Sequence, residues 1–120
     1  MRPIYLLVLP LLFLACDEKP AFLESQLHGD WKAISWEDIT NNKVYDAEVT
    51  FSFAADGRYV ATQGGGEEVG KYWIEADNLH TIEDGMAEKK VKIETLNPDT
   101  LIFGMNRVGA LERIVLVRKP

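Results

Sequence analysis

The sequence is poor in the residue types that most often build metal and thiol sites. It has one cysteine, Cys16, and two histidines, His28 and His80. A single cysteine excludes a disulfide within the chain. Two histidines without a third nearby do not match zinc-site spacing, even if Asp30 is counted as a ligand. We therefore expect no metal site and interpret both histidines as surface or turn residues.

Catalytic and nucleotide-binding motifs are also missing. The sequence contains no G-x-S-x-G elbow, no P-loop and no G-x-G-x-x-G. Gly64-Gly65-Gly66 is followed by acidic residues, so we interpret it as a hairpin loop. The pairs Glu37-Asp38 and Glu67-Glu68 are adjacent and would diverge in extended chain, which does not suit acid–base catalysis across one bond. These absences predict a protein that is not an enzyme and uses no cofactor.

Positive charge is scarce as well. Nineteen Asp and Glu face thirteen Lys and Arg, for a formal net charge of −6 at pH 7. The basic residues gather only at Lys89, Lys90 and Lys92. This balance argues against nucleic-acid binding and against a polybasic membrane patch. The length of 120 residues provides for one domain.

The N-terminal apolar run, Ile4 to Ala15, is too short to span a membrane. A membrane span needs about 20 apolar residues, whereas the h-region of a signal peptide needs about 7–15. Arg2 precedes the run and Asp17 follows soon after it. Residues 1–15 are therefore predicted to be a cleaved signal peptide. Loss of Arg2 changes the net charge from −6 to −7.

Leu14-Ala15-Cys16 resembles the lipobox of bacterial lipoproteins, although Phe13 replaces the usual leucine. The alternative is a chance cysteine at the end of an ordinary signal peptide, but Phe13 is large for that cleavage site. The resemblance implies a diacylglyceryl group and a palmitate-like acyl chain on Cys16, which becomes the first residue of the mature protein. Two chains anchor stably where one is marginal, at about 0.8 kcal/mol per methylene.

The resemblance also implies a place in the bacterial cell envelope, with the membrane as a partner. Asp17 resembles an inner-membrane retention signal of enterobacteria. Asp17-Glu18 together resemble the acidic export tract of surface lipoproteins in Bacteroidota. We favour the outer membrane.

After Cys16 the sequence predicts a tether with a short helix over residues 16–26 and an all-β domain over residues 27–120. Period-two alternation between turn signals predicts eight strands, joined as an antiparallel meander that closes into a small up-and-down β-barrel. They are Asp30–Trp36, Asp46–Ala54, Arg58–Gln63, Glu68–Ala76, Leu79–Glu83, Ala87–Leu96, Thr100–Arg107 and Leu111–Arg118.

Alternation also predicts which side chains point inward. The clear inward rows are Val49, Phe51 and Phe53; Tyr72 and Ile74; Val91 and Ile93; and Leu101, Phe103 and Met105. The first strand is apolar on both faces, since Ile34 and Trp36 alternate with Trp31 and Ala33. We expect the segment from Phe22 to Leu27 to cover its outer face.

From Leu27 to Lys119 the chain resembles the lipocalin-like domains of bacterial lipoproteins. The motifs that carry the resemblance are Leu27-His28-Gly29-Asp30-Trp31, Phe53-Ala54-Ala55-Asp56-Gly57-Arg58-Tyr59, Gly70-Lys71-Tyr72-Trp73-Ile74, Asp99-Thr100-Leu101 and Leu116-Val117-Arg118-Lys119. The T-D-Y motif of larger lipocalins is absent.

The resemblance implies that one end of the barrel is closed by Gly29, Trp31 and an arginine. Gly29 would let the backbone approach the end of the barrel, which Trp31 would plug. Arg118 or Arg113 would pack across the tryptophan, a cation–π contact of about 0.5–2 kcal/mol.

A barrel of eight strands either fills with side chains or holds one small ligand. Both alternatives stay open. If a ligand is bound, the residues expected around it are Trp31, Ser35, Phe51, Phe53, Tyr59, Gln63, Tyr72, Thr95, Phe103 and Met105. We predict that the barrel binds a small apolar or amphipathic molecule without catalysis. The alternative is a filled barrel that binds an envelope protein through Trp36 and Trp73, which the alternation places on the outer faces.

Overall fold

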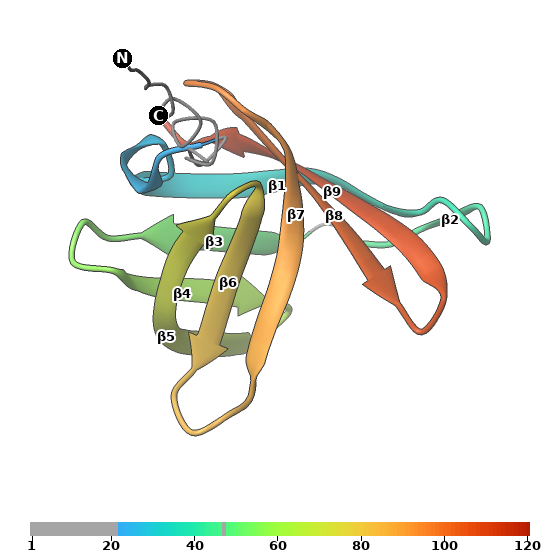
Figure 1. Cartoon of the computed structure of the whole chain (residues 1–120). Coiled ribbons are helices and arrows are strands. Elements are labelled where there is room, and N and C mark those ends of the chain that lie inside the picture. The colour runs from blue at the N-terminus through green and yellow to red at the C-terminus, as the bar shows by residue number, and fades with distance from the viewer. Residues whose placement is uncertain (1–21, 47) are drawn as a thin grey trace, which may run out of the picture.

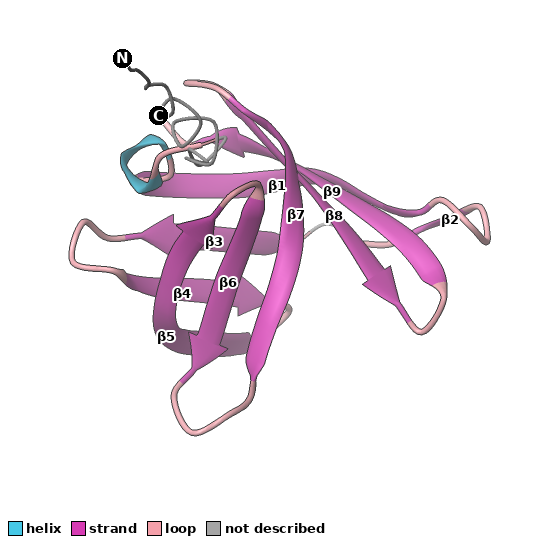
Figure 2. Cartoon of the chain, in the orientation of Figure 1, coloured by secondary structure: helices cyan, strands magenta, loops and turns pink. Residues whose placement is uncertain are grey.

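The computed structural model describes residues 22–46 and 48–120, and almost all of their regular structure is β (Figure 2). The predicted signal peptide, Cys16 and the start of the predicted tether lie outside the described residues. One 3-10 turn, η2 (Glu24–Gln26), precedes the strands. The strands are β1 (Gly29–Asp38), β2 (Lys43–Val44), β3 (Val49–Phe53), β4 (Arg58–Gln63), β5 (Gly66–Glu75), β6 (Asn78–Glu83), β7 (Glu88–Leu96), β8 (Thr100–Arg107) and β9 (Ala110–Arg118) (Figure 1).

Each strand pairs antiparallel with its neighbour in the order β2-β1-β3-β4-β5-β6-β7-β8-β9, and β9 returns to pair with β1. This return closes an eight-stranded barrel, which confirms the predicted fold class. The two-residue strand β2 is an addition that pairs only with the end of β1. In place of the expected N-terminal helix, the described residues before Gly29 form a single 3-10 turn.

The barrel is closed tightly at one end and spreads apart at the other. β1 pairs with β3 only from Gly29 to Lys32, although it pairs with β9 from Trp31 to Asp38. β7 pairs with β6 over Glu88–Lys92 and with β8 over Lys92–Leu96. The far halves of β1, β8 and β9, with β2, therefore diverge from β3–β7 (Figure 1). We call the two ends the closed end and the open end.

A β-bulge in β1 corrects the predicted orientation of Trp36. The register shifts between Ala33 and Ser35, and Trp36 then lies opposite the buried Ile114. An inserted residue of this kind reverses the alternation beyond it. Trp36 consequently points into the barrel and is only 9% exposed, so the expected outward placement is wrong.

The same geometry moves Ser35 and Thr95 to the outer face. Ser35 pairs with Val115, which lies between two inward residues of β9. A second bulge, between Ile93 and Thr95, pairs Thr95 with Ile102, which likewise lies between buried residues. Opposite residues of an antiparallel pair share a face. The expectation that Ser35 and Thr95 point inward is therefore wrong.

The other predicted inward rows do form the core. The buried members include Val49, Phe53, Tyr72, Ile93, Leu101 and Phe103, while Phe51, Ile74, Val91 and Met105 pack against them. Within residues 22–46 and 48–120, no helix is long and apolar enough to cross a membrane.

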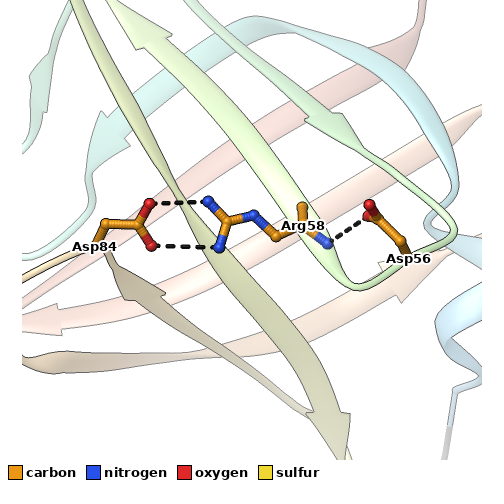
Figure 3. Close-up of polar contacts among 3 residues, drawn as sticks. All are labelled: Asp56, Arg58 and Asp84. Carbon is orange, nitrogen blue, oxygen red and sulfur yellow. Dashed lines mark hydrogen bonds and ion pairs between the residues drawn. The ribbon is translucent and has the colours of Figure 1, made fainter.

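An ion pair on the outside of the barrel joins β4 to the end of β6 across β5 (Figure 3). The Arg58 guanidinium donates to both carboxylate oxygens of Asp84, at 3.3 and 2.8 Å. The Arg58 backbone N–H donates to Asp56 Oδ1 at 3.0 Å, within the turn between β3 and β4. The hydrogen bonds from Arg58 hold the pKa of Asp84 below its ordinary value. The F-x-x-D-G-x-Y segment thus shapes a turn and also fastens three strands.

Candidate functional site

The closed end is plugged by Trp31 and Arg118. Trp31 is fully buried, and its indole N–H donates to the Leu27 carbonyl at 2.8 Å. The guanidinium carbon of Arg118 lies 4.1 Å from the centroid of the Trp31 ring. Arg118 also donates to the carbonyls of Pro98, His28 and Gln26 at 2.7, 2.6 and 3.1 Å. Of the two arginines proposed for this contact, the structure places Arg118 there.

The other candidate, Arg113, pairs instead with Glu94 at 2.8 Å. Gly29 adopts φ +123°, where L side chains are strained, and a Cβ atom there would lie 2.5 Å from Arg118 Nη1. Gly29, Trp31 and Arg118 therefore meet at one end of the barrel and plug it.

The barrel next to the plug is filled by aromatic side chains. The Phe53 and Tyr72 rings meet edge to face at 4.9 Å, and the Tyr59 ring centroid lies 6.4 Å from that of Phe53. The Tyr72 hydroxyl donates to the Ala54 carbonyl at 2.6 Å. Burial, with the nearby charges of Glu24 and Asp56, raises the pKa of Tyr72 to about 12. Buried aromatic side chains thus fill this half of the interior.

A cavity of about 490 Å³ lies at the open end, where the two halves of the barrel separate. Its apolar lining consists of Trp36, Val49, Phe51, Leu79, Val91, Phe103, Met105 and Ile114. Its polar lining consists of Gln63, Glu68, Thr81, Lys89, Lys90, Asn106 and Arg107. An apolar interior with a polar border is the usual make-up of a small-molecule site.

Four of the predicted ligand-contacting residues line this cavity: Phe51, Gln63, Phe103 and Met105. Trp31, Phe53, Tyr59 and Tyr72 lie in the core closer to the plug instead, and Ser35 and Thr95 lie on the outer face. The sequence analysis missed Trp36 and the basic residues. The inward row of β8 reaches Arg107 two residues after Met105, and the inward row of β7 begins at Lys89. Extending these two rows would have found Arg107 and Lys89.

A buried glutamate supports the β8–β9 wall of the cavity. Glu112 is 4% exposed, and its Oε1 accepts hydrogen bonds from Trp36 Nε1 at 2.9 Å and from Arg107 Nη1 at 3.3 Å. The partners compensate the cost of burying a carboxylate. Glu112 thus fixes the Trp36 ring against the cavity and holds Arg107 at the border.

A second polar group lies on the opposite wall. The Tyr59 hydroxyl donates to Glu68 Oε2, and Lys89 Nζ lies 3.3 Å from Glu68 Oε1. Burial, followed by the hydrogen bond to Glu68, raises the pKa of Tyr59. Tyr59 therefore stays a neutral donor at physiological pH. Each wall of the open end therefore carries one ion pair, Glu68–Lys89 on one side and Glu112–Arg107 on the other.

Comparison with known proteins identifies this arrangement. The lipocalin-like domain family matches residues 27–103. The chain belongs to this family. The matched region includes Gly29 and Trp31 of the closed end and every strand from β1 to β7.

Two solved structures share the lipocalin-like fold. One is a lipocalin-like protein from Bacteroides uniformis, with a TM-score of 0.61 and 16% identity over 78% of this chain and 99% of that one. The other is an uncharacterized protein from Bacteroides eggerthii, with a TM-score of 0.61 and 15% identity over the same shares. No curated protein matches the sequence. At these identities the structural likeness establishes the fold alone.

The outer face of the lipocalin-like barrel carries a compact cluster around His80. The ring stacks on Trp73 at 5.2 Å, and its two nitrogens lie 2.6 Å from Glu88 and 3.2 Å from Glu75. His80 thus lies on the outer face, but it is only 8% exposed because Trp73, Glu75 and Glu88 cover it. Within the described part of the chain, no group of His, Cys, Asp and Glu is arranged to hold a metal. Binding of an envelope protein through Trp73 stays a prediction.

Proposed function

We propose that this lipocalin-like protein is anchored to the outer membrane by a lipid on Cys16 and binds a small apolar or amphipathic molecule in its barrel, without catalysis. The observation that carries the proposal is the cavity of about 490 Å³. Ligand pockets commonly have volumes of about 300–1,000 Å³. This volume favours a bound ligand over the alternative from the sequence, a completely filled barrel that binds an envelope protein.

The side chains around the cavity support ligand binding rather than catalysis. The carboxylates near the cavity, Glu68 and Glu112, are each engaged by two donors. A carboxylate engaged in this way is a poor general base. The apolar wall offers contact area to a ligand, and the border offers hydrogen-bond donors.

Native mass spectrometry of the protein purified from its own host tests ligand binding. We expect an added mass that disappears after unfolding and delipidation. A protein that carries no added mass, and that also fails to bind a neutral apolar dye such as N-phenyl-1-naphthylamine, would contradict the proposal.

Metabolic labelling with a clickable palmitate tests the anchor separately. The wild-type protein should take up the label and Cys16→Ser should not, because the lipid is joined through the cysteine sulfur. Incorporation of the label into Cys16→Ser would show that the lipobox assignment is wrong.

A further inference from the structure

The border of the cavity carries more basic than acidic side chains, although the protein as a whole is acidic. The chain carries a formal net charge of −6, but the charged residues that line the cavity are Glu68, Lys89, Lys90 and Arg107. A local excess of one sign in a concave site attracts ligands of the opposite sign. The border of the cavity thus favours ligands with a negative charge, although the net charge of the chain does not.

The neighbouring carboxylates reduce this excess but do not use up the donors. Glu68 is bound by Tyr59 and Lys89, and Glu112, just behind the lining, is bound by Trp36 and Arg107. An arginine has five N–H donors and a lysine three. The Lys89 and Arg107 side chains are 57% and 59% exposed, so donors remain available on both.

Lys90 adds a further positive charge at the same opening. Among the described residues it takes part in no ion pair. It lies in the part of β7 that does not pair with β8, and Arg107 lies in the part of β8 that does not pair with β7. Lys90 and Asn106 line both the cavity and a smaller adjoining hollow of about 280 Å³ between these strands. Lys90 pairs with His80, so its side chain leaves from the outer side of β7, whereas Arg107 continues the inward row of β8. The gap between the two strands therefore has a cation on each side.

We propose that the ligand is a single-chain amphiphile with an acidic head group, a carboxylate or a phosphate. Its chain packs against Phe51, Phe103 and Met105, and its head lies between Lys90 and Arg107. The Trp36–Glu112 hydrogen bond keeps Arg107 directed at the border. This inference rests on the proposed ligand-binding function and adds the chemistry of the head group.

The test compares four ligands with the same twelve-carbon chain: dodecanoate, dodecyl phosphate, dodecanol and dodecylamine. A chain that begins at Asp17 retains every described strand and the whole described core, and a cooperative thermal transition checks that it is folded. Each ligand displaces N-phenyl-1-naphthylamine at submicellar concentration, pH 7.5 and low salt. We expect at least one acidic ligand to bind about tenfold tighter than dodecanol, the difference that one charge-assisted hydrogen bond provides.

The variants locate the head group. Lys90→Gln and Arg107→Gln should each reduce the preference for the acidic ligand over dodecanol by about threefold or more. Lys32→Gln is the matched control, because it removes the same charge from an exposed position of β1 near the closed end. In the wild type, added salt should also weaken binding of the acidic ligand but not of dodecanol.

The outcomes separate this inference from the proposed function. Equal binding of all four ligands, or tightest binding of dodecylamine, would overturn the acidic head group and leave ligand binding standing. An acidic preference that Lys32→Gln lowers as much as the two border variants would also overturn it, since the effect would come from net charge. Failure of the dye and of every ligand to bind would contradict the proposed function itself.

Discussion

At the scale of single residues, Arg118 does more than any other described side chain to close the barrel. It covers Trp31 and donates to three carbonyls from two separate segments. We expect Arg118→Ala to lower the free energy of unfolding by about 1–3 kcal/mol, because a cation–π contact and several hydrogen bonds are lost together. Urea unfolding followed by tryptophan fluorescence measures the change.

Arg113→Ala is the matched control, because Arg113 lies on the same strand and makes one exposed ion pair with Glu94. Its effect should stay below about 1 kcal/mol. Equal losses in the two variants would show that the plug does not depend on the Trp31–Arg118 contact.

The raised pKa of Tyr72 gives a prediction for alkaline pH. Burial raises this pKa from 10.0 to about 12, so the folded protein disfavours the phenolate. The stability that Tyr72 contributes is fully present below pH 10 and is lost as the pH rises from 10 to 12. Tyr72→Phe should therefore lose less thermal stability over that interval than the wild type, as melting temperatures across the pH series would show. Parallel losses would assign the alkaline transition to other groups.

Residue patterns predicted the core well and the cavity border poorly. The odd-numbered apolar residues of β3 and β8 point inward as alternation requires, so Phe51, Phe103 and Met105 were found. Arg107 continues the inward row of β8, and Lys89 begins the inward row of β7. They were passed over because charged side chains are ordinarily assigned to solvent, and nothing local shows that the strands diverge there.

At the scale of strands, the positions of the two bulges could not be predicted from the alternation of apolar and polar residues. Each adds one residue that local composition does not distinguish from an ordinary strand residue. Beyond it the inward positions change from odd to even, which moved Trp36 inside and Ser35 outside. The apolar character of both faces of β1 was the visible sign. We interpreted it as an outer face covered by the N-terminal segment, whereas a reversal of the alternation explains Trp36.

The ion pair that spans β4 to β6 gives a prediction at this scale. Arg58 holds the pKa of Asp84 below its ordinary value of 3.8, so this pair stabilises the fold above that pH and loses its effect as the pH falls through the lowered pKa. Arg58→Gln should raise the pKa of Asp84 toward 3.8, which a carbon-detected NMR titration of the carboxyl group measures. Lys71→Gln, on the strand between them, should have the smaller effect, since Lys71 contributes less to the shift than Arg58. An unchanged Asp84 pKa in Arg58→Gln would mean that the pair does not form in solution.

At the scale of the whole molecule, the plug, the cavity and the proposed anchor lie in a fixed order along the barrel. The segment that leads from Cys16 enters at the closed end, where the carbonyls of Gln26 and Leu27 bind Arg118 and Trp31. Five residues lie between Cys16 and Phe22, so a fully extended chain would span about 20 Å at most from one to the other. β1 then runs from the closed end to the open end over ten residues, about 30 Å. We therefore expect the proposed lipid on Cys16 to hold the closed end near the bilayer, which would place the cavity on the far side, where a ligand would exchange with the aqueous phase.

Fluorescence quenching in vesicles that contain nitroxide-labelled head groups tests this orientation in the lipidated protein. The lipid leaves no free thiol on Cys16, so single cysteines take the fluorophore selectively. Asp99→Cys places it in the exposed turn beside Arg118 at the closed end, and Lys43→Cys places it in the exposed strand β2 at the open end. We expect stronger quenching at residue 99 than at residue 43, because nitroxide quenching acts over short range and the two sites lie at opposite ends of β1. The reverse order would put the cavity mouth against the bilayer, and the ligand would then pass directly between membrane and barrel.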